Sequence, residues 1–194
     1  MNPTFATSLW PAARSNWMLQ VMLAVAGSII LAISAQVSIP VQPVPFTLQT
    51  LALLLIGAAY GPWLGAATLL LYLAEGAVGL PVFQGFKSAF QVYYSAGYLI
   101  AYPFAAFIAG FFTRDIQNFR QRGFVPGFLT ALIAFLAADA LVFALGYAWL
   151  ANLIGGEKAW YGGVAPFLIW DGLKVAIAAL ITVGAWQTIG DKTV

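Results

Sequence analysis

Long apolar stretches alternate along the chain with short segments rich in proline, glycine or charge. A helix that crosses the hydrocarbon core of a bilayer needs about 20 mainly apolar residues. Six stretches approach this length and are predicted to be spanning helices: 16–37, 47–60, 61–80, 93–112, 125–152 and 164–189. The pattern predicts an all-α membrane protein, with a short segment, 1–15, before a single domain, 16–194, that forms a compact bundle of six transmembrane helices.

The connections between these stretches predict the orientation of the bundle. Pro40, Pro43 and Pro45 favour an extended connection before the second span. Lysine and arginine accumulate in cytoplasmic loops. If both termini are cytoplasmic, the outer side holds only Lys87 and Lys158, and the inner side holds the other basic residues near span ends: Arg14, Arg114, Arg120, Arg122 and Lys192. We therefore expect both termini, including 1–15, to lie in the cytoplasm.

Composition narrows the classes of function. Hydrophobic residues make up 62% of the chain and charged residues only 7%, whereas soluble domains carry about 25% charged residues. The net charge is +2 and the basic residues are scattered, which argues against a nucleic-acid partner. The chain has no cysteine and no histidine, so disulfides, thiol or imidazole catalysis and the usual zinc or haem ligands are excluded. No cofactor or metal is expected.

Two opposite charges lie in the last predicted span. The stretch FLIWDGLKVAIAAL, 167–180, places Asp171 and Lys174 one helical turn apart on the same face. Each charge costs about 2.5 to 3.5 kcal/mol at the centre of a membrane helix, so such a residue indicates a functional site. If the span begins at Val164, Asp171 lies roughly 10 Å from the outer end. The alternative is an ion pair that only stabilises the bundle.

Further polar and aromatic groups are expected in the outer half of the bundle. Gln49 follows the proline-rich connection, and Gln84 and Lys87 belong to the connection after the third span. A small-molecule site is usually apolar with a few placed polar groups. We therefore predict an outward-facing pocket for an amphiphilic ligand, whose candidate residues are Asp171, Lys174, Gln49, Gln84, Lys87, Phe83, Tyr94, Tyr98 and Trp170. Gln84 and Lys87 could equally be ordinary polar loop residues.

Three other features have two interpretations each. Ala24, Ser28 and Ala32 repeat every four residues in the first span, which suits close helix packing, either within the bundle or against a separate membrane subunit. Glu75 is either a pocket residue or an interfacial one. Asp139, near the middle of the fifth span, either makes a structural hydrogen bond or supports the pocket from behind.

The segment from Pro40 to Phe83, PVQPVPFTLQTLALLLIGAAYGPWLGAATLLLYLAEGAVGLPVF, resembles the signature region of a known family. It is similar to the biotin-specific substrate-binding subunit, BioY type, of energy-coupling-factor transporters. The late DGLK, carrying Asp171 and Lys174, is similar to the D-x-x-K of that family. The resemblance covers most of the chain from the first predicted helix onward.

This resemblance implies a substrate-capture subunit of the bacterial cytoplasmic membrane that binds biotin from outside. It implies two kinds of partner, a transmembrane coupling subunit and ATP-binding-cassette ATPase subunits, with Ala24, Ser28 and Ala32 contacting the coupling subunit. The chain has no P-loop of its own, so ATP hydrolysis belongs to a partner.

Other functions compete with this one. A subunit of the same type could take another small vitamin. An intramembrane enzyme could use Asp139 and Asp171 as a carboxylate pair, but they lie on different predicted helices at different depths. A purely structural subunit is the third alternative. The sequence favours a transporter subunit that is not an enzyme.

Overall fold

The computed structural model describes residues 4–9, 11–114 and 123–190. The first half of the chain contains α1 (Phe5–Leu9), η1 (Pro11–Arg14), α2 (Trp17–Gln36), β1 (Ser38–Ile39), β2 (Phe46–Thr47) and α3 (Gln49–Ala77). The second half contains η2 (Ala89–Gln91), η3 (Tyr93–Ser95), α4 (Ala96–Thr113), α6 (Phe124–Ile154), α7 (Gly156–Gly163) and α8 (Leu168–Gly190). The chain is therefore mainly helical, as its hydrophobic pattern predicts.

Within the described residues, five helical segments are long and apolar enough to cross a membrane: 17–36, 49–77, 93–113, 124–154 and 168–187. The count differs from the predicted six because the second and third predicted spans are continuous in α3. Gly61 interrupts α3 with a non-helical backbone, φ 80° and ψ 178°, and Pro62 follows it. Left-handed φ is tolerated by glycine, and proline suits the start of a helix. The break separates 49–60 from 62–77.

Two other differences from the predicted elements lie near the proline-rich and glycine-rich connections. The extended connection closes into a small antiparallel hairpin, in which Ser38 pairs with Thr47 and Ile39 with Phe46. The glycine-rich turn after the fifth span contains a short helix, α7, and α8 begins at Leu168 rather than Val164. Asp171 therefore lies in the first turn of α8.

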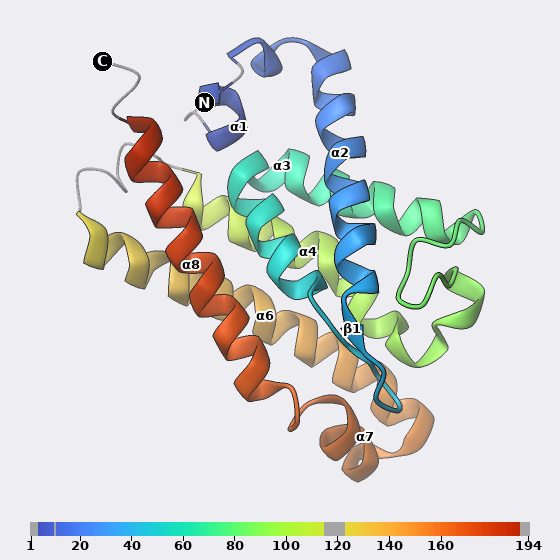
Figure 1. Cartoon of the computed structure of the whole chain (residues 1–194). Helices are drawn as coiled ribbons and strands as arrows, with labels where there is room; N and C mark the ends of the chain where they lie inside the picture. The colour runs from blue at the N-terminus through green and yellow to red at the C-terminus, as the bar shows by residue number, and fades with distance from the viewer. Residues whose placement is uncertain (1–3, 10, 115–122, 191–194) are drawn as a thin grey trace.

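The helices form one bundle with two distinct ends (Figure 1). α1 and the C-terminal end of α8 lie at one end, whereas the β1–β2 hairpin and α7 lie at the other. α1 and η1 fold onto the bundle: Ala6 and Ala13 are buried, and the ring of Phe5 packs edge-on against Trp186 of α8 at 5.0 Å. The segment before α2 is thus in contact with the helical domain.

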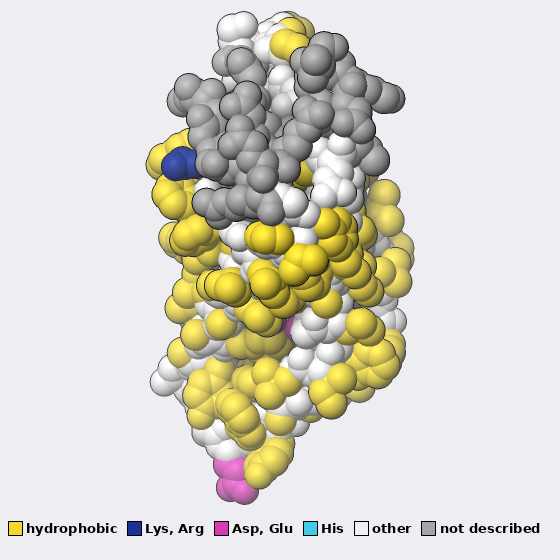
Figure 2. Space-filling view, turned by 90° about the vertical axis from the view of Figure 1, so that its left-hand side faces the viewer, with side chains coloured by type: hydrophobic (Ala, Val, Ile, Leu, Met, Phe, Trp, Pro, Cys, Tyr) yellow, Lys and Arg dark blue, Asp and Glu magenta, His cyan; other side chains and the backbone are white. Residues whose placement is uncertain are grey.

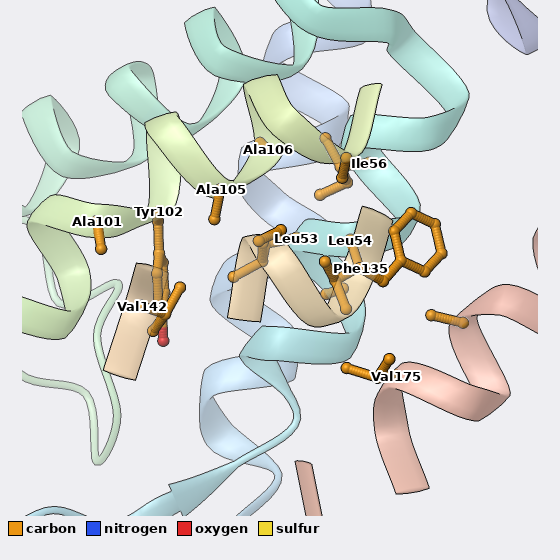
Figure 3. Packing of buried hydrophobic residues seen from close by; sticks show 14 of the residues in the cluster. Leu53, Leu54, Ile56, Ala101, Tyr102, Ala105, Ala106, Phe135, Val142 and Val175 are labelled. Atoms are coloured by element: carbon orange, nitrogen blue, oxygen red, sulfur yellow. The ribbon is translucent and has the colours of Figure 1, made fainter. Parts of the chain in front are cut away.

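Side chains from several helices form a continuous apolar core (Figure 3). Leu53 and Leu54 of α3 and Phe135 of α6 are almost completely buried. The outward side of the bundle is also apolar, and hydrophobic side chains cover the middle of the face shown in Figure 2. Apolar surface inside and outside is the composition that a lipid environment requires. The chain is an integral membrane protein.

Glycines let α3 and α4 approach closely. A Cβ atom placed on Gly57 would lie 2.5 Å from the carbonyl oxygen of Ala106, and one on Gly110 would lie 2.5 Å from the carbonyl oxygen of Gly57. Small residues at a membrane helix interface allow such backbone contact. This contact packs α4 closely against α3.

Candidate ligand-binding site

The end of the bundle that carries the hairpin contains a cavity of about 190 Å³. Its walls come from the proline-rich hairpin, the start of α3, the connection after α3, and the adjacent parts of α4, α6 and α8. The lining residues are Pro40, Val41, Gln42, Pro43, Val44, Pro45, Thr47, Gln49, Thr50, Phe83, Gln84, Lys87, Gln91, Val92, Tyr94, Ser95, Tyr98, Leu99, Tyr102, Val142, Phe143, Phe167, Asp171 and Lys174. The walls combine aromatic and aliphatic groups with amide, hydroxyl and charged ones, as expected for an amphiphilic ligand.

Asp171 and Lys174 form an ion pair at this cavity. Lys174 Nζ lies 2.7 Å from Asp171 Oδ1, and the two side chains are only 13% and 4% exposed. Nζ also donates to the carbonyl oxygen of Thr47 at 2.7 Å and to Thr50 Oγ1 at 3.1 Å. An ammonium group has three donors, so Lys174 is fully paired by the protein itself.

Thr50 joins the two charged groups. Its hydroxyl donates to Asp171 Oδ1 at 2.6 Å while it accepts from Lys174. Oδ1 therefore receives two hydrogen bonds, and no described residue donates to the second carboxylate oxygen, Oδ2. Oδ2 also keeps some accessible surface, since it is not among the fully buried side-chain atoms without a partner. The arrangement holds the carboxylate in place and leaves one oxygen for a ligand.

The position of Asp171 in the helix supports its negative charge. It lies in the first turn of α8, where the helix dipole places partial positive charge. Because α8 begins at Leu168, Asp171 lies closer to the start of its helix than the roughly 10 Å expected for a span that begins at Val164.

The structure brings together most of the predicted site residues. Asp171, Lys174, Gln49, Gln84, Lys87, Phe83, Tyr94 and Tyr98 all line the cavity. Trp170 does not line it and is 58% exposed. Successive helix residues are rotated by about 100°, so Trp170 turns away when Asp171 faces inward.

Gln49 and Tyr98 combine a place in the wall with structural hydrogen bonds. Gln49 Nε2 donates to Tyr72 Oη at 2.8 Å, and the Tyr98 hydroxyl donates to the carbonyl oxygen of Gly163 at 2.8 Å. These bonds hold the two side chains against neighbouring elements.

The sequence prediction missed several lining residues. Thr50, the bridge between the charges, follows Gln49 in the run TLQT and lies three residues after the hairpin strand β2. Phe167 stacks on Phe46 with ring centroids 4.0 Å apart and meets Phe143 at 6.3 Å. Thr50 has a sequence signal in its position at the start of a span, whereas Phe143 on α6 has none that separates it from other apolar core residues.

The small residues of α2 face partly inward. Ser28 is fully buried, and its hydroxyl donates to Glu75 Oε1 of α3 at 2.9 Å. Ala24 and Ala32 are half-buried. The geometry favours packing within the bundle for Ser28 and gives Glu75 a partner inside the protein; contact of this stripe with another subunit stays a prediction.

Asp139 is buried in α6, and its Oδ1 has no hydrogen-bond partner. Within the described residues, no hydrogen bond joins it to Asp171, which is paired with Lys174 and Thr50. The two aspartates therefore do not form a hydrogen-bonded carboxylate pair.

Comparison with known proteins places this chain in a family. The model of the BioY family matches residues 7–191. A probable biotin transporter BioY of Pyrococcus horikoshii is 39% identical over 151 residues, which are 77% of this chain and 85% of that protein. The biotin transporter BioY of Rhizobium etli is 32% identical, over 75% of this chain and 79% of that protein.

The fold comparison agrees. The crystal structure of an S-component for biotin from an ECF-type ABC transporter superposes with a TM-score of 0.71 and 24% sequence identity. The match covers 90% of this chain and 92% of that one, so the two share a fold. The sequence match over nearly the whole chain shows that this protein belongs to the BioY family.

Proposed function

We propose that this protein captures biotin in the Asp171–Lys174 cavity as the substrate-binding subunit of an energy-coupling-factor transporter. Membership of the BioY family, whose relatives are named biotin transporters, supports this function rather than an enzymatic one. The observation that carries the proposal is a buried carboxylate held by Lys174 and Thr50, with Oδ2 unpaired at a cavity of mixed polar and apolar lining.

The chemistry of biotin suits this cavity. The ligand has a ureido ring with two N–H donors, an apolar thioether ring and chain, and a carboxylate tail. Asp171 Oδ2 accepts from one ureido N–H group, while Lys174 holds the aspartate or exchanges one of its bonds for a ligand oxygen. Gln84 or Lys87 serves the far polar end, and aromatic side chains such as Phe167 contact the rings.

The proposal includes the placement of the protein in the membrane. The helices cross the bacterial cytoplasmic membrane as a six-span bundle. The two parts of α3 on either side of the break at Gly61 make two of these crossings. Both termini are cytoplasmic and the cavity opens outward. α1 and the C-terminal end of α8 lie at the end opposite the hairpin, which supports this placement (Figure 1).

Delivery of biotin requires partners. A transmembrane coupling subunit and ABC-type ATPase subunits supply the energy, because this chain has no P-loop. The half-buried Ala24 and Ala32 of α2 contribute to contact with the coupling subunit.

Isothermal titration of the purified protein with biotin tests the proposal. We expect saturable binding by the wild-type protein and binding weakened by about 10- to 100-fold in Asp171→Asn, because a charge-assisted hydrogen bond contributes about 1.5 to 3 kcal/mol. Glu157→Gln is the matched control, since it makes the same change on the exposed surface of α7.

Absence of biotin binding at micromolar concentrations would reject the assigned ligand. Titration of the same protein with other small vitamins then tests the alternative function, in which a subunit of the same type binds another substrate. Equal biotin affinity of the wild-type protein and Asp171→Asn would show that biotin binds at another site.

A further inference from the structure

The connection after α3 forms a tight turn at the edge of the cavity. Phe83 and Lys87 exchange main-chain hydrogen bonds, from Phe83 N to Lys87 O at 2.9 Å and from Lys87 N to Phe83 O at 3.2 Å. At its tip, Gly85 and Phe86 have left-handed backbones, with φ of 70° and 56°. Residues other than glycine rarely adopt this backbone conformation, so Phe86 needs support from its surroundings. Gln84 and Lys87, which line the cavity, belong to this turn.

The side chain of Gln36, the last residue of α2, fills the turn. Its carbonyl oxygen Oε1 accepts from Gly85 N at 3.1 Å and from Phe86 N at 3.2 Å. Its amide Nε2 donates to the carbonyl oxygen of Phe83 at 3.0 Å. Two successive main-chain N–H groups that converge on one oxygen form a concave donor site, which here is occupied by the protein's own amide.

The start of the turn has a second, separate anchor. The Tyr72 hydroxyl donates to the carbonyl oxygen of Val82 at 3.0 Å and accepts from Gln49. The ring of Phe83 lies so close to Gly76 that a Cβ atom there would be 2.2 Å from Phe83 Cζ. These contacts hold 82–83, whereas the N–H groups of the tip are held by Gln36.

We propose that Gln36 is a positioning residue of the ligand site. It does not line the cavity, and it acts through the 83–87 turn by keeping Gln84 and Lys87 in the wall. Gln84 itself reaches only one described partner, Ser38 Oγ of the hairpin at 3.2 Å, so its place depends on the turn's backbone. This inference rests on the proposed function in taking the cavity as the biotin site.

Hydrogen–deuterium exchange of Gly85 and Phe86, measured without biotin, tests the turn directly. Gln36→Leu has a similar size but offers no hydrogen bond, so exchange of these amides should be accelerated by about tenfold. Gln36→Glu keeps an accepting oxygen and should retain most of the protection. Gln20→Leu is the matched control, because Gln20 lies on the same helix and its side-chain amide donates to Ala13 O, far from the turn.

The dissociation rate of biotin is the second readout. It should rise by about tenfold in Gln36→Leu, less in Gln36→Glu, and not in Gln20→Leu. Gln36→Ala serves as a second loss variant if Gln36→Leu does not fold. Wild-type exchange at Gly85 and Phe86 in the loss variants would overturn the proposal, as would faster exchange with unchanged biotin dissociation. Failure of wild-type protein to bind biotin would reject the proposed function, whereas the exchange pattern would still support the role of Gln36 in holding the turn.

Discussion

Lys174 places a full positive charge inside the bundle and uses all three of its donors on protein acceptors. Burial of a charge pair is favourable only when the remaining hydrogen-bonding groups are also satisfied. Thr50 meets this condition, because its single hydroxyl serves both partners. The charge pair is therefore a three-residue unit that spans α3 and α8.

Removal of the Thr50 hydroxyl tests this unit. Thr50→Val keeps the shape of the side chain but deprives Asp171 of a donor and Lys174 of an acceptor. We expect roughly tenfold weaker biotin binding by isothermal titration, because hydrogen bonds to charged groups contribute about 1.5 to 3 kcal/mol. Thr130→Val, in which the lost hydroxyl donates to the main chain of its own helix at Pro126, is the control. Wild-type affinity in Thr50→Val would contradict the three-residue unit.

The charged residues of the site could be predicted from the sequence, whereas some of the aromatic residues around them could not. Asp171 and Lys174 stand out because ionisable residues are rare in apolar spans. Phe143 and Phe167 resemble any other core residue until the fold shows which face meets the cavity. Gln36 has no sequence signal, since its role depends on the left-handed turn 47 residues or more away along the chain.

At the scale of elements, Tyr98 connects α4 with α6 and with the end of α7. Its ring occupies space above Gly146, where a Cβ atom would lie 2.2 Å from Cδ1, and its hydroxyl bonds the carbonyl oxygen of Gly163. A larger residue at position 146 would push Tyr98 out of this place and disturb the cavity wall.

Gly146→Ala should therefore destabilise the protein although alanine is the better helix former. We expect a loss of roughly 1 to 3 kcal/mol from overpacking, seen as a lower midpoint of thermal unfolding in detergent. Gly184→Ala is the matched control, because a Cβ atom there meets nothing within 4 Å. It should be neutral or slightly stabilising through helix propensity. Equal midpoints for wild-type and Gly146→Ala would contradict the close packing of Tyr98.

The helices were predicted from the length of the apolar stretches and the breaks between them, but two features of the connections were not. The predicted second and third spans join in α3, since Gly61 turns the backbone without the polar loop that usually separates two helices. α7 forms within a glycine-rich segment because tertiary contacts, such as those of buried Ala159, outweigh the low helix propensity of glycine.

At the scale of the whole molecule, the orientation in the membrane decides whether the cavity meets the outside. Lys158 of α7 lies near the hairpin end of the bundle, whereas Arg114 follows α4 toward the other end (Figure 1). The distribution of basic residues is the basis for the proposed cytoplasmic location of the Arg114 side.

Single-cysteine labelling in intact cells tests this orientation, because the chain has no native cysteine. A maleimide that cannot cross membranes should label Lys158→Cys from outside and should label Arg114→Cys only after the membrane is permeabilised. Both positions are exposed, so accessibility within the protein is matched. The reverse pattern would place the cavity on the cytoplasmic side.

A structure of the protein determined with bound biotin tests the central claim most directly. We predict ligand density in the cavity, with the ureido group within hydrogen-bond distance of Asp171 and the turn at Gln84 and Lys87 closing the opposite wall. Biotin bound elsewhere, or an unchanged cavity at saturating biotin, would contradict the assignment of this charge pair to ligand capture.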